Sequence, residues 1–404
     1  MGTARTDTEI RPSQGPAAPS NGVPFFTQAE SFKELWPLIS SHVGDVVDRG
    51  KFSHGRKVSE LEQALAKYTG ARHALGVNSG TDALVILLRA AGIGPGDEVI
   101  VPAFTFFASA SAVTMTGATP VFADITADGD YALDPASVEA AITDRTRAVM
   151  PVHLFSQLAD MGALLELARR HGLLVLEDSA EAIGMRWDGT HAGLLGSGGV
   201  LSFFPTKTLG ALGDAGMILT DDDRIAEQAS VLRHHGRMGK TIDHIAGISN
   251  LSGVSGTNSK MDDIQAAILM ARLSRLDESI ARRRVLADAY TERLTGADGV
   301  LAVPRLVPRS VPSDPVFYVY LIEVEHRDEL VARLTARGIG TETYYPRTLH
   351  TQPCYAEEHG GRSLPRAEAA SRRTVALPLY PDLTEDQIDT VCAAVSDFYA
   401  EGQW

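Results

Sequence analysis

A single lysine follows a short apolar run in the middle of the chain. Residues 199–204 form the run and predict a buried strand, and Lys207 comes shortly after it in a turn flanked by glycines. Burial disfavours a charged ammonium, so the pKa of a lysine in this place is expected to fall, which exposes its nucleophilic neutral form. The structural alternative is a lysine on a surface loop, which is the commoner place for this residue type.

An acidic pair follows another apolar run. Glu177 and Asp178 come directly after residues 173–176, at the expected carboxyl end of a buried strand. Ligands bind at these ends in open parallel sheets, where Asp178 can hold a charged ring nitrogen, an amine or a metal. A helix N-cap or a structural salt bridge is the alternative. A metal is disfavoured because no cluster of His, Cys or Asp with ligand spacing surrounds the residue.

A third polar motif combines a glycine with hydroxyl side chains. Residues 78–84 (Asn-Ser-Gly-Thr-Asp-Ala-Leu) follow the predicted strand 74–77 and open a helix. The free N–H groups of a helix N-terminus suit a phosphate group. Ser79 and Asp82 also fit a capping box, and the two roles are compatible because free backbone donors remain.

Aromatic residues follow one more predicted strand. Phe104, Phe106 and Phe107 come just after residues 99–101; such residues usually belong to the core, although one of them can stack on a planar ring. The lysine, the acid and the helix start together predict a pyridoxal phosphate pocket. The lysine forms the Schiff base, the acid keeps the ring nitrogen protonated, and the helix start takes the phosphate.

Composition excludes several other classes of protein. The chain has 404 residues, 44% of them apolar and 22% charged, which is ordinary for a soluble globular protein. A net charge of −14 without a basic cluster argues against binding to nucleic acid. Cys354 and Cys392 are too few for a disulfide framework and lack the spacing of metal ligands. No apolar run approaches the length of a membrane span and no secretory signal is visible, so we expect a cytoplasmic protein without a metal site.

The elements that must position these residues alternate along the chain. Between residues 55 and 273, short apolar runs alternate with helical patterns, which predicts an α/β fold with a mostly parallel sheet covered on both faces. The predicted strands are residues 74–77, 98–101, 120–123, 148–152, 173–176, 200–204 and 216–219.

The last third of the chain changes character. Residues 264–294 predict long, continuous helix as a connector, and a strand at 317–324 with helices at 327–337 and 385–399 predicts an α+β lobe. We therefore expect a disordered N-terminal tail, a large cofactor-binding domain and a small C-terminal domain, at residues 1–22, 23–275 and 276–404.

The order of motifs resembles the DegT/DnrJ/EryC1/StrS family, the sugar aminotransferases of fold type I. The resemblance covers nearly the whole chain from about residue 23, and it implies a seven-stranded, mostly parallel sheet between helices. It is carried by residues 79–84 (Ser-Gly-Thr-Asp-Ala-Leu), 102–106 (Pro-Ala-Phe-Thr-Phe), 151–154 (Pro-Val-His-Leu), 177–181 (Glu-Asp-Ser-Ala-Glu), 202–207 (Ser-Phe-Phe-Pro-Thr-Lys), 232–236 (Leu-Arg-His-His-Gly), 256–261 (Gly-Thr-Asn-Ser-Lys-Met) and 265–267 (Gln-Ala-Ala).

The resemblance assigns a role to each matching position. Lys207 would carry the cofactor as a Schiff base and later act as the general base of the proton shift. Asp178 would pair with the pyridinium nitrogen. Gly80, Thr81 and Ser202 would bind the phosphate of pyridoxal 5'-phosphate.

Further positions would complete the pocket. Phe106 would stack on the ring, and Glu181 stands near the ring hydroxyl, where many members carry Gln or His. Asn258 would reach the phosphate from the other subunit, which makes a homodimer the working unit. The substrate would contact Phe52, His54, Tyr318, Tyr344 and Tyr345.

The resemblance also implies a reaction. Lys207 is present, which argues against the members that carry histidine there and remove a hydroxyl group. We expect transfer of an amino group from L-glutamate to a nucleotide-linked keto-deoxysugar, with dTDP as the nucleotide. Residues 213–216 (Gly-Asp-Ala-Gly) favour a 3-keto over a 4-keto sugar. The alternatives are a cyclic polyol ketone, an aminobenzoate-type precursor, or a non-catalytic regulatory protein that binds the cofactor.

Overall fold

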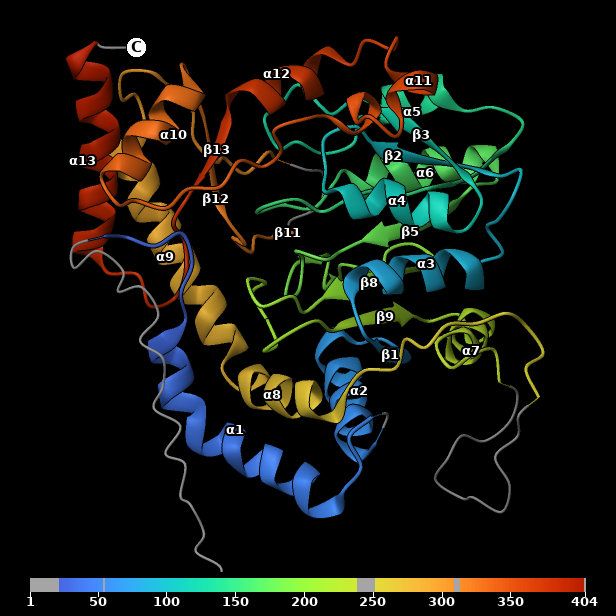
Figure 1. Cartoon of the computed structure of the whole chain (residues 1–404). Helices are drawn as coiled ribbons and strands as arrows, with labels where there is room; N and C mark the ends of the chain where they lie inside the picture. The colour runs from blue at the N-terminus through green and yellow to red at the C-terminus, as the bar shows by residue number, and fades with distance from the viewer. Residues whose placement is uncertain (1–21, 54, 238–250, 309–312, 403–404) are drawn as a thin grey trace, which may run out of the picture.

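A seven-stranded sheet forms the centre of the molecule (Figure 1). The computed structural model describes residues 22–53, 55–237, 251–308 and 313–402, so the predicted tail lies almost wholly outside the described residues. The strand order is β1-β9-β8-β5-β4-β2-β3, and β9 is antiparallel to both of its neighbours while the other pairs are parallel. The strands are β1 (His73–Val77), β2 (Glu98–Pro102), β3 (Thr119–Ala123), β4 (Thr146–Val149), β5 (Leu174–Asp178), β8 (Gly198–Ser202) and β9 (Gly216–Thr220). The sheet confirms the predicted α/β class.

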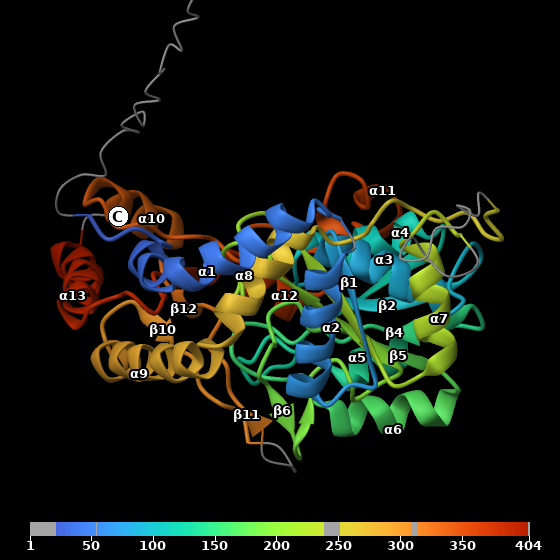
Figure 2. The ribbon, with the colours of Figure 1, turned by 90° about the horizontal axis from the view of Figure 1, so that it is seen from below.

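Helices cover both faces of this sheet (Figure 2). Helices α3, α4 and α7 pack on one face, and α2, α5, α6 and α8 pack on the other. The strands are buried almost throughout, because helices cover the sheet on both sides. Strands in this position carry apolar residues on both faces. The helices are α1 (Ala29–Arg49), α2 (Arg56–Thr69), α3 (Gly80–Ala90), α4 (Phe107–Met115), α5 (Pro135–Ala141), α6 (Met161–His171), α7 (Asp223–Leu232) and α8 (Asp263–Leu273).

The C-terminal part builds a second, smaller core. An antiparallel sheet in the order β10-β12-β13 packs against α9, α10 and α13, which stand together beside the main sheet in Figure 1. A short sheet in the order β11-β6-β7 ties the segment before β12 to the main body. The boundary near residue 275 stays a prediction. The elements are β6 (Arg186–Trp187), β7 (Thr190–His191), α9 (Leu276–Leu294), β10 (Val300–Ala302), β11 (Ser313–Asp314), β12 (Tyr320–Val324), α10 (Arg327–Ala336), η1 (Leu349–Thr351), α11 (Ala356–His359), α12 (Pro365–Arg373), β13 (Thr374–Leu377) and α13 (Glu385–Glu401).

The connecting helix is not continuous, which corrects the sequence-based expectation. Helix α8 ends at Leu273 and α9 begins at Leu276. Between them the Ser274 hydroxyl donates to the Ala271 carbonyl at 2.7 Å, and the backbone turns at Arg275. A serine that bonds its own backbone competes with the helical hydrogen bonds, and apolar periodicity alone does not report such a break.

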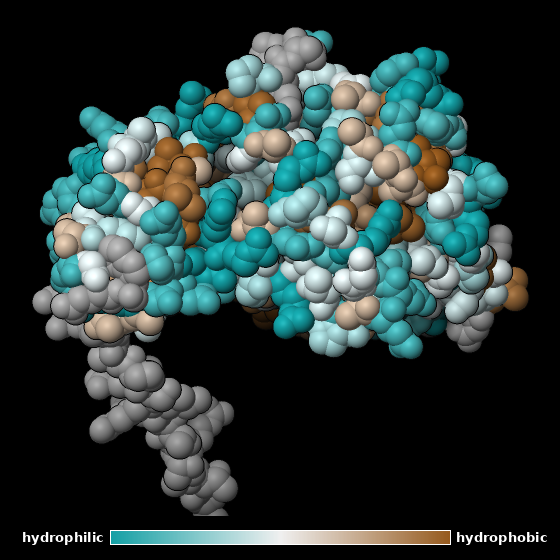
Figure 3. Space-filling model, turned by 90° about the horizontal axis from the view of Figure 1, so that it is seen from above, coloured by the Kyte–Doolittle hydropathy of each residue, from teal (hydrophilic) through white to brown (hydrophobic). Residues whose placement is uncertain are grey.

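The surface is mostly polar where it is seen from above. Figure 3 shows a largely hydrophilic face on which hydrophobic side chains lie in separate patches. Across the described ranges, no helix is both long and apolar enough to span a membrane.

Candidate active site

A cavity of about 350 Å³ lies at the carboxyl ends of β5 and β8. This is the edge of a parallel sheet at which ligands bind. Most of the residues singled out from the sequence line it, although they come from segments far apart in the chain. These residues are Gly80, Thr81, Phe106, Asp178, Glu181, Ser202, Lys207, Tyr318, Tyr344 and Tyr345.

Lys207 lies inside this cavity, with its side chain 15% exposed. Its Nζ lies 3.2 Å from Glu181 Oε1 and 4.2 Å from the centre of the Tyr318 ring. Burial lowers the pKa of Lys207, but the neighbouring Glu181, with help from Tyr318 and Asp178, outweighs burial, and the net pKa is raised. The expected lowering of the Lys207 pKa is therefore wrong, because the sequence did not show how close Glu181 lies to the amine.

Asp178 ends strand β5 and is 4% exposed. Its Oδ2 accepts a hydrogen bond from the Ser109 hydroxyl at 2.7 Å, and its Oδ1 accepts one from the Ala180 N–H at 3.2 Å. These contacts fix the carboxylate in the cavity wall and match neither alternative role, the helix N-cap or the salt bridge. Ser109 was not among the residues predicted from the sequence. The one indication was that it follows β2, whose carboxyl end lies at the same edge of the sheet as that of β5.

The preceding residue has a structural role instead. Glu177 is fully buried, and its carboxylate accepts hydrogen bonds at 2.7 Å from the backbone N–H groups of Gly193, Leu195 and Gly196. His153 Nε2 lies 2.9 Å from the same carboxylate, and its Nδ1 accepts from the Ala159 N–H. Successive strand residues face opposite sides, so Glu177 ties down a loop behind the sheet while Asp178 faces the cavity.

The start of α3 forms a cradle at one end of the cavity. The Ser79 hydroxyl accepts from the Asp82 N–H at 3.1 Å, which confirms the predicted cap. The N–H groups of Gly80 and Thr81 in the first turn have no acceptor within the helix. A Cβ on Gly80 would lie 2.8 Å from Ser202 Cβ, so only glycine lets the helix start approach β8 this closely. The cradle suits a phosphate group.

Aromatic side chains also line the cavity. Phe106 is 59% exposed, so one face of its ring is available to a ligand. The Tyr318 hydroxyl lies 3.1 Å from the Thr206 hydroxyl, and the buried Tyr345 hydroxyl has no hydrogen-bond partner. Burial raises the pKa of Tyr344 and of Tyr345, so both remain neutral phenols that can donate a hydrogen bond.

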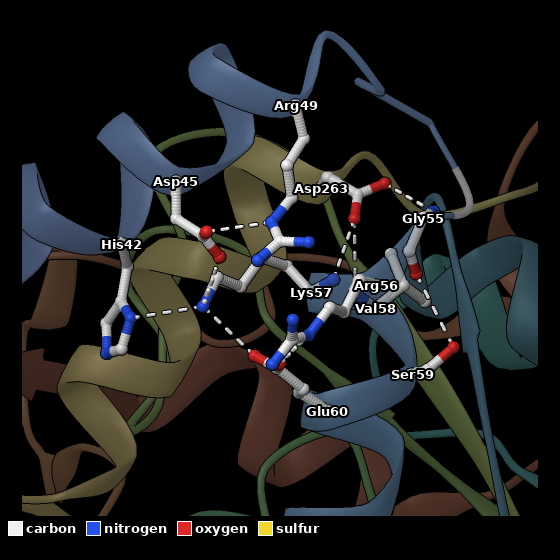
Figure 4. A network of polar contacts seen from close by, with 10 residues as sticks. All are labelled: His42, Asp45, Arg49, Gly55, Arg56, Lys57, Val58, Ser59, Glu60 and Asp263. Atoms are coloured by element: carbon white, nitrogen blue, oxygen red, sulfur yellow. Dashed lines mark hydrogen bonds and ion pairs between the residues drawn. The ribbon is translucent and has the colours of Figure 1, made fainter.

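The loop before α2 is anchored to α8 through Asp263 (Figure 4). The Asp263 carboxylate accepts from the N–H groups of Gly55 at 2.5 Å and Lys57 at 2.9 Å, so it caps α2 from α8. Phe52 is half exposed and does not line the cavity of its own chain, and His54 lies outside the described residues. Their contact with substrate stays a prediction.

Asn258 also lies away from the cavity of its own chain. It forms an isolated bridge with His234, and its side-chain oxygen accepts a hydrogen bond from Lys260 Nζ. The side chain is exposed, so a second subunit could be reached from it.

The residues in the cavity fit pyridoxal 5'-phosphate. The cavity brings together a lysine amine, a buried carboxylate, a glycine cradle at a helix start and a buried hydroxyl without a partner. A planar, phosphorylated ring whose nitrogen can carry a proton complements each of these groups.

Comparison with known proteins identifies the family. The family model described as "DegT/DnrJ/EryC1/StrS aminotransferase family" matches residues 37–396. A Geobacillus stearothermophilus protein named pleiotropic regulatory protein is 43% identical over 379 residues, which cover 93% of this chain and 98% of that protein. A Streptomyces venezuelae protein named dTDP-3-amino-3,4,6-trideoxy-alpha-D-glucose transaminase is 43% identical over 377 residues, covering 93% and 96%.

A solved structure agrees with these matches. The crystal structure of S. venezuelae DesV in complex with a ketimine intermediate superposes with a TM-score of 0.87 at 42% identity, covering 94% of this chain and 98% of that one. The chain belongs to the DegT/DnrJ/EryC1/StrS aminotransferase family, whose cofactor is pyridoxal 5'-phosphate.

Proposed function

We propose that the protein transfers the amino group of L-glutamate to a dTDP-linked 3-keto-deoxysugar during the synthesis of an amino sugar. The observation that carries the proposal is the placement of Lys207 and Asp178 in one cavity beside the α3 cradle. The choice of sugar is supported by the name of the S. venezuelae relative, which acts as a dTDP-3-amino-sugar transaminase.

Each side chain has a part in this proposal. Bound pyridoxal phosphate supplies an electron-accepting ring. Lys207 holds the cofactor and then moves a proton to and from the substrate carbon, and Asp178 keeps a proton on the ring nitrogen. Glu181 accepts from Lys207 Nζ at 3.2 Å and so orients the amine between proton transfers. Phe106 limits the movement of the ring.

The remaining wall of the cavity is proposed to hold the sugar. Tyr318, Tyr344 and Tyr345 come from the segments after β11 and α10 and line the cavity with their phenol groups. Phenols can donate to the hydroxyl and keto oxygens of a sugar. Asp214 also lines the cavity and is the local residue we propose to select the 3-keto position.

A panel of ketosugars tests this proposal. Holoenzyme with L-glutamate is offered dTDP-linked 3-keto and 4-keto 6-deoxyhexoses, and the aminated products are measured by mass spectrometry. We expect kcat/KM to favour the 3-keto sugar by about tenfold or more, because one misplaced carbonyl costs hydrogen bonds in the reacting geometry. A preference for the 4-keto sugar would overturn the choice of carbon. Amination of a cyclic polyol ketone alone would overturn the sugar assignment.

We also propose that the working unit is a homodimer in which Asn258 completes the phosphate site of the partner. The support is that Asn258 is exposed and absent from the cavity of its own chain. Phe204 and Leu212, in the segment that carries Lys207, are exposed apolar residues that a second subunit would cover.

Complementation between two defective variants tests the shared site. We expect Asn258→Ala to weaken cofactor binding and Lys207→Ala to be inactive. A mixed dimer of the two would contain one intact site, because Lys207 of one subunit would meet Asn258 of the other. Random co-assembly should then restore about a quarter of the wild-type activity, measured per dimer after co-expression. If co-expressed variants stay inactive although Asn258→Ala alone is impaired, Asn258 acts within its own subunit.

A further inference from the structure

A second cavity, of about 280 Å³, lies behind the segment that carries Lys207. Its walls come from α1, from the junction of α8 and α9, and from residues 381–382. Helix α1 runs along α8 in both ribbon views (Figures 1 and 2). Thr208 lines this second cavity while its neighbour Lys207 lines the catalytic one, so adjacent residues of one segment face two different sites.

The floor of the second cavity holds buried polar groups without partners. Both polar atoms of the Gln28 amide, the Thr208 hydroxyl and the Ser279 hydroxyl make no hydrogen bond. Gln28 is 5% exposed and Thr208 is 3% exposed. Unmade hydrogen bonds of buried groups are costly and uncommon, and three side chains of this kind on one floor indicate that the cavity receives a polar ligand.

The charge beneath this floor is positive. The Arg272 guanidinium lines the cavity, and burial together with Arg283 lowers the pKa of Arg272 to about 10. Arg283 is fully buried, and its Nε and one terminal nitrogen have no partner. Asp382 is the carboxylate that faces Arg272, and it accepts from the Ser31 N–H at 3.2 Å. Two buried cations against one carboxylate leave positive charge, which favours an anion.

The rim adds no net charge that would repel an anion. Arg275 and Glu278 form an exposed ion pair at 2.7 Å. Arg282 donates to the Leu383 carbonyl at 2.9 Å, and Glu34 is exposed on α1. The two arginines and two glutamates of the rim balance in charge, so the charge that distinguishes the cavity is the one beneath its floor.

We propose that this second cavity binds a small oxyanion, a carboxylate or a phosphate, and that the bound anion braces the segment that carries Lys207. Thr208 and Arg272 connect the second cavity to this segment. The anion would accept from the Thr208 hydroxyl directly, and Arg272 Nη1 already donates to the Gly210 carbonyl of the same segment. Binding here would therefore stabilise the backbone on both sides of Lys207 without entering the catalytic cavity.

Calorimetric titration of the holoenzyme tests this proposal. The holoenzyme is used because its bound cofactor already fills the phosphate site of the catalytic cavity, so an added anion cannot bind there. Inorganic phosphate and succinate are titrated separately into the wild type, Thr208→Val and Gln28→Leu, and binding by either probe identifies the kind of oxyanion. We expect each substitution to weaken the Kd of the binding probe about tenfold, the value of one hydrogen bond to a charged group. Failure of both probes to bind the wild type, or equal Kd values in all three proteins, would overturn the proposal.

A stability comparison keeps the test independent of folding defects. The Thr208 hydroxyl has no partner, so Thr208→Val should leave the unfolding midpoint of the ligand-free holoenzyme unchanged or raise it. Thr220→Val is the matched control, because Thr220 donates to the Ser197 carbonyl at 2.8 Å and accepts from the Asp222 N–H at 3.1 Å, and its midpoint should fall. The binding anion should raise the midpoints of the wild type and of Thr220→Val by similar amounts and that of Thr208→Val by less, as a tenfold weaker Kd requires. An equal rise in all three would contradict a site at Thr208.

Discussion

Replacing Lys207 with alanine is expected to abolish amino transfer, with kcat falling by about 10⁴-fold or more. In the proposed function this amine both holds the cofactor and moves the proton, and Glu181 and Tyr318 lie 3.2 Å from it and, measured to the ring centre, 4.2 Å. Steady-state turnover with L-glutamate and the best ketosugar measures the loss. Mass spectrometry of the borohydride-treated protein should find the cofactor attached to the wild type alone.

Lys207→Arg is the matched control for this loss. Arginine keeps a cation beside Glu181, so the variant should unfold at nearly the wild-type temperature, yet its guanidinium cannot act as the nucleophile. We expect it to be folded and inactive, which separates chemistry from charge pairing. Turnover by Lys207→Ala within about tenfold of the wild type would contradict the proposed role.

Asp178→Asn is expected to slow the reaction with L-glutamate by about 10² to 4 × 10³-fold. The carboxylate is 4% exposed, and removing one partner of a buried ionic pair costs about 3–5 kcal/mol, of which each 1.4 kcal/mol is tenfold in rate. An amide has nearly the same shape: its oxygen can still accept from the Ala180 N–H, and its NH2 group can donate to the Ser109 hydroxyl oxygen instead of accepting from it, so the fold should persist. Stopped-flow absorbance of the cofactor after mixing with L-glutamate measures the rate.

Ser109→Ala is the control that separates the charge of Asp178 from its hydrogen bond. It removes the 2.7 Å hydrogen bond to Asp178 but leaves the negative charge, so the rate should fall only about threefold to tenfold. If Asp178→Asn is no slower than Ser109→Ala, the charge of Asp178 has no special role at the ring nitrogen.

Much of the fold could be predicted because its signals are local. Each strand of the main sheet is a short apolar run, and the run before Lys207 and the run before Asp178 end at the same edge of the sheet, as parallel strands must. The Ser79 cap was visible because its partner lies three residues away. Contacts within a few residues leave a pattern in the sequence.

The rest depends on contacts between distant residues. Ser109 reaches Asp178 from 69 positions away, and Lys207 meets Glu181 across 26 positions. The second of these contacts reversed the expected direction of the Lys207 pKa shift. The break after α8 also escaped prediction, because the Ser274 hydroxyl rather than a Gly or Pro interrupts the helix there. Through-space electrostatics and side-chain capping leave no periodic pattern in the sequence.

Lys207 and Asp178 are proposed to serve one cavity that moves nitrogen from L-glutamate to a nucleotide-linked ketosugar. The most direct test supplies holoenzyme with ¹⁵N-labelled L-glutamate and a dTDP-linked 3-keto-6-deoxyhexose, then weighs the sugar product by mass spectrometry. We predict a dTDP-aminosugar that carries the ¹⁵N label in the wild type, and no such product with Lys207→Ala. An unlabelled aminosugar would contradict glutamate as the donor, and a labelled aminosugar from Lys207→Ala at the wild-type rate would contradict the account of the site.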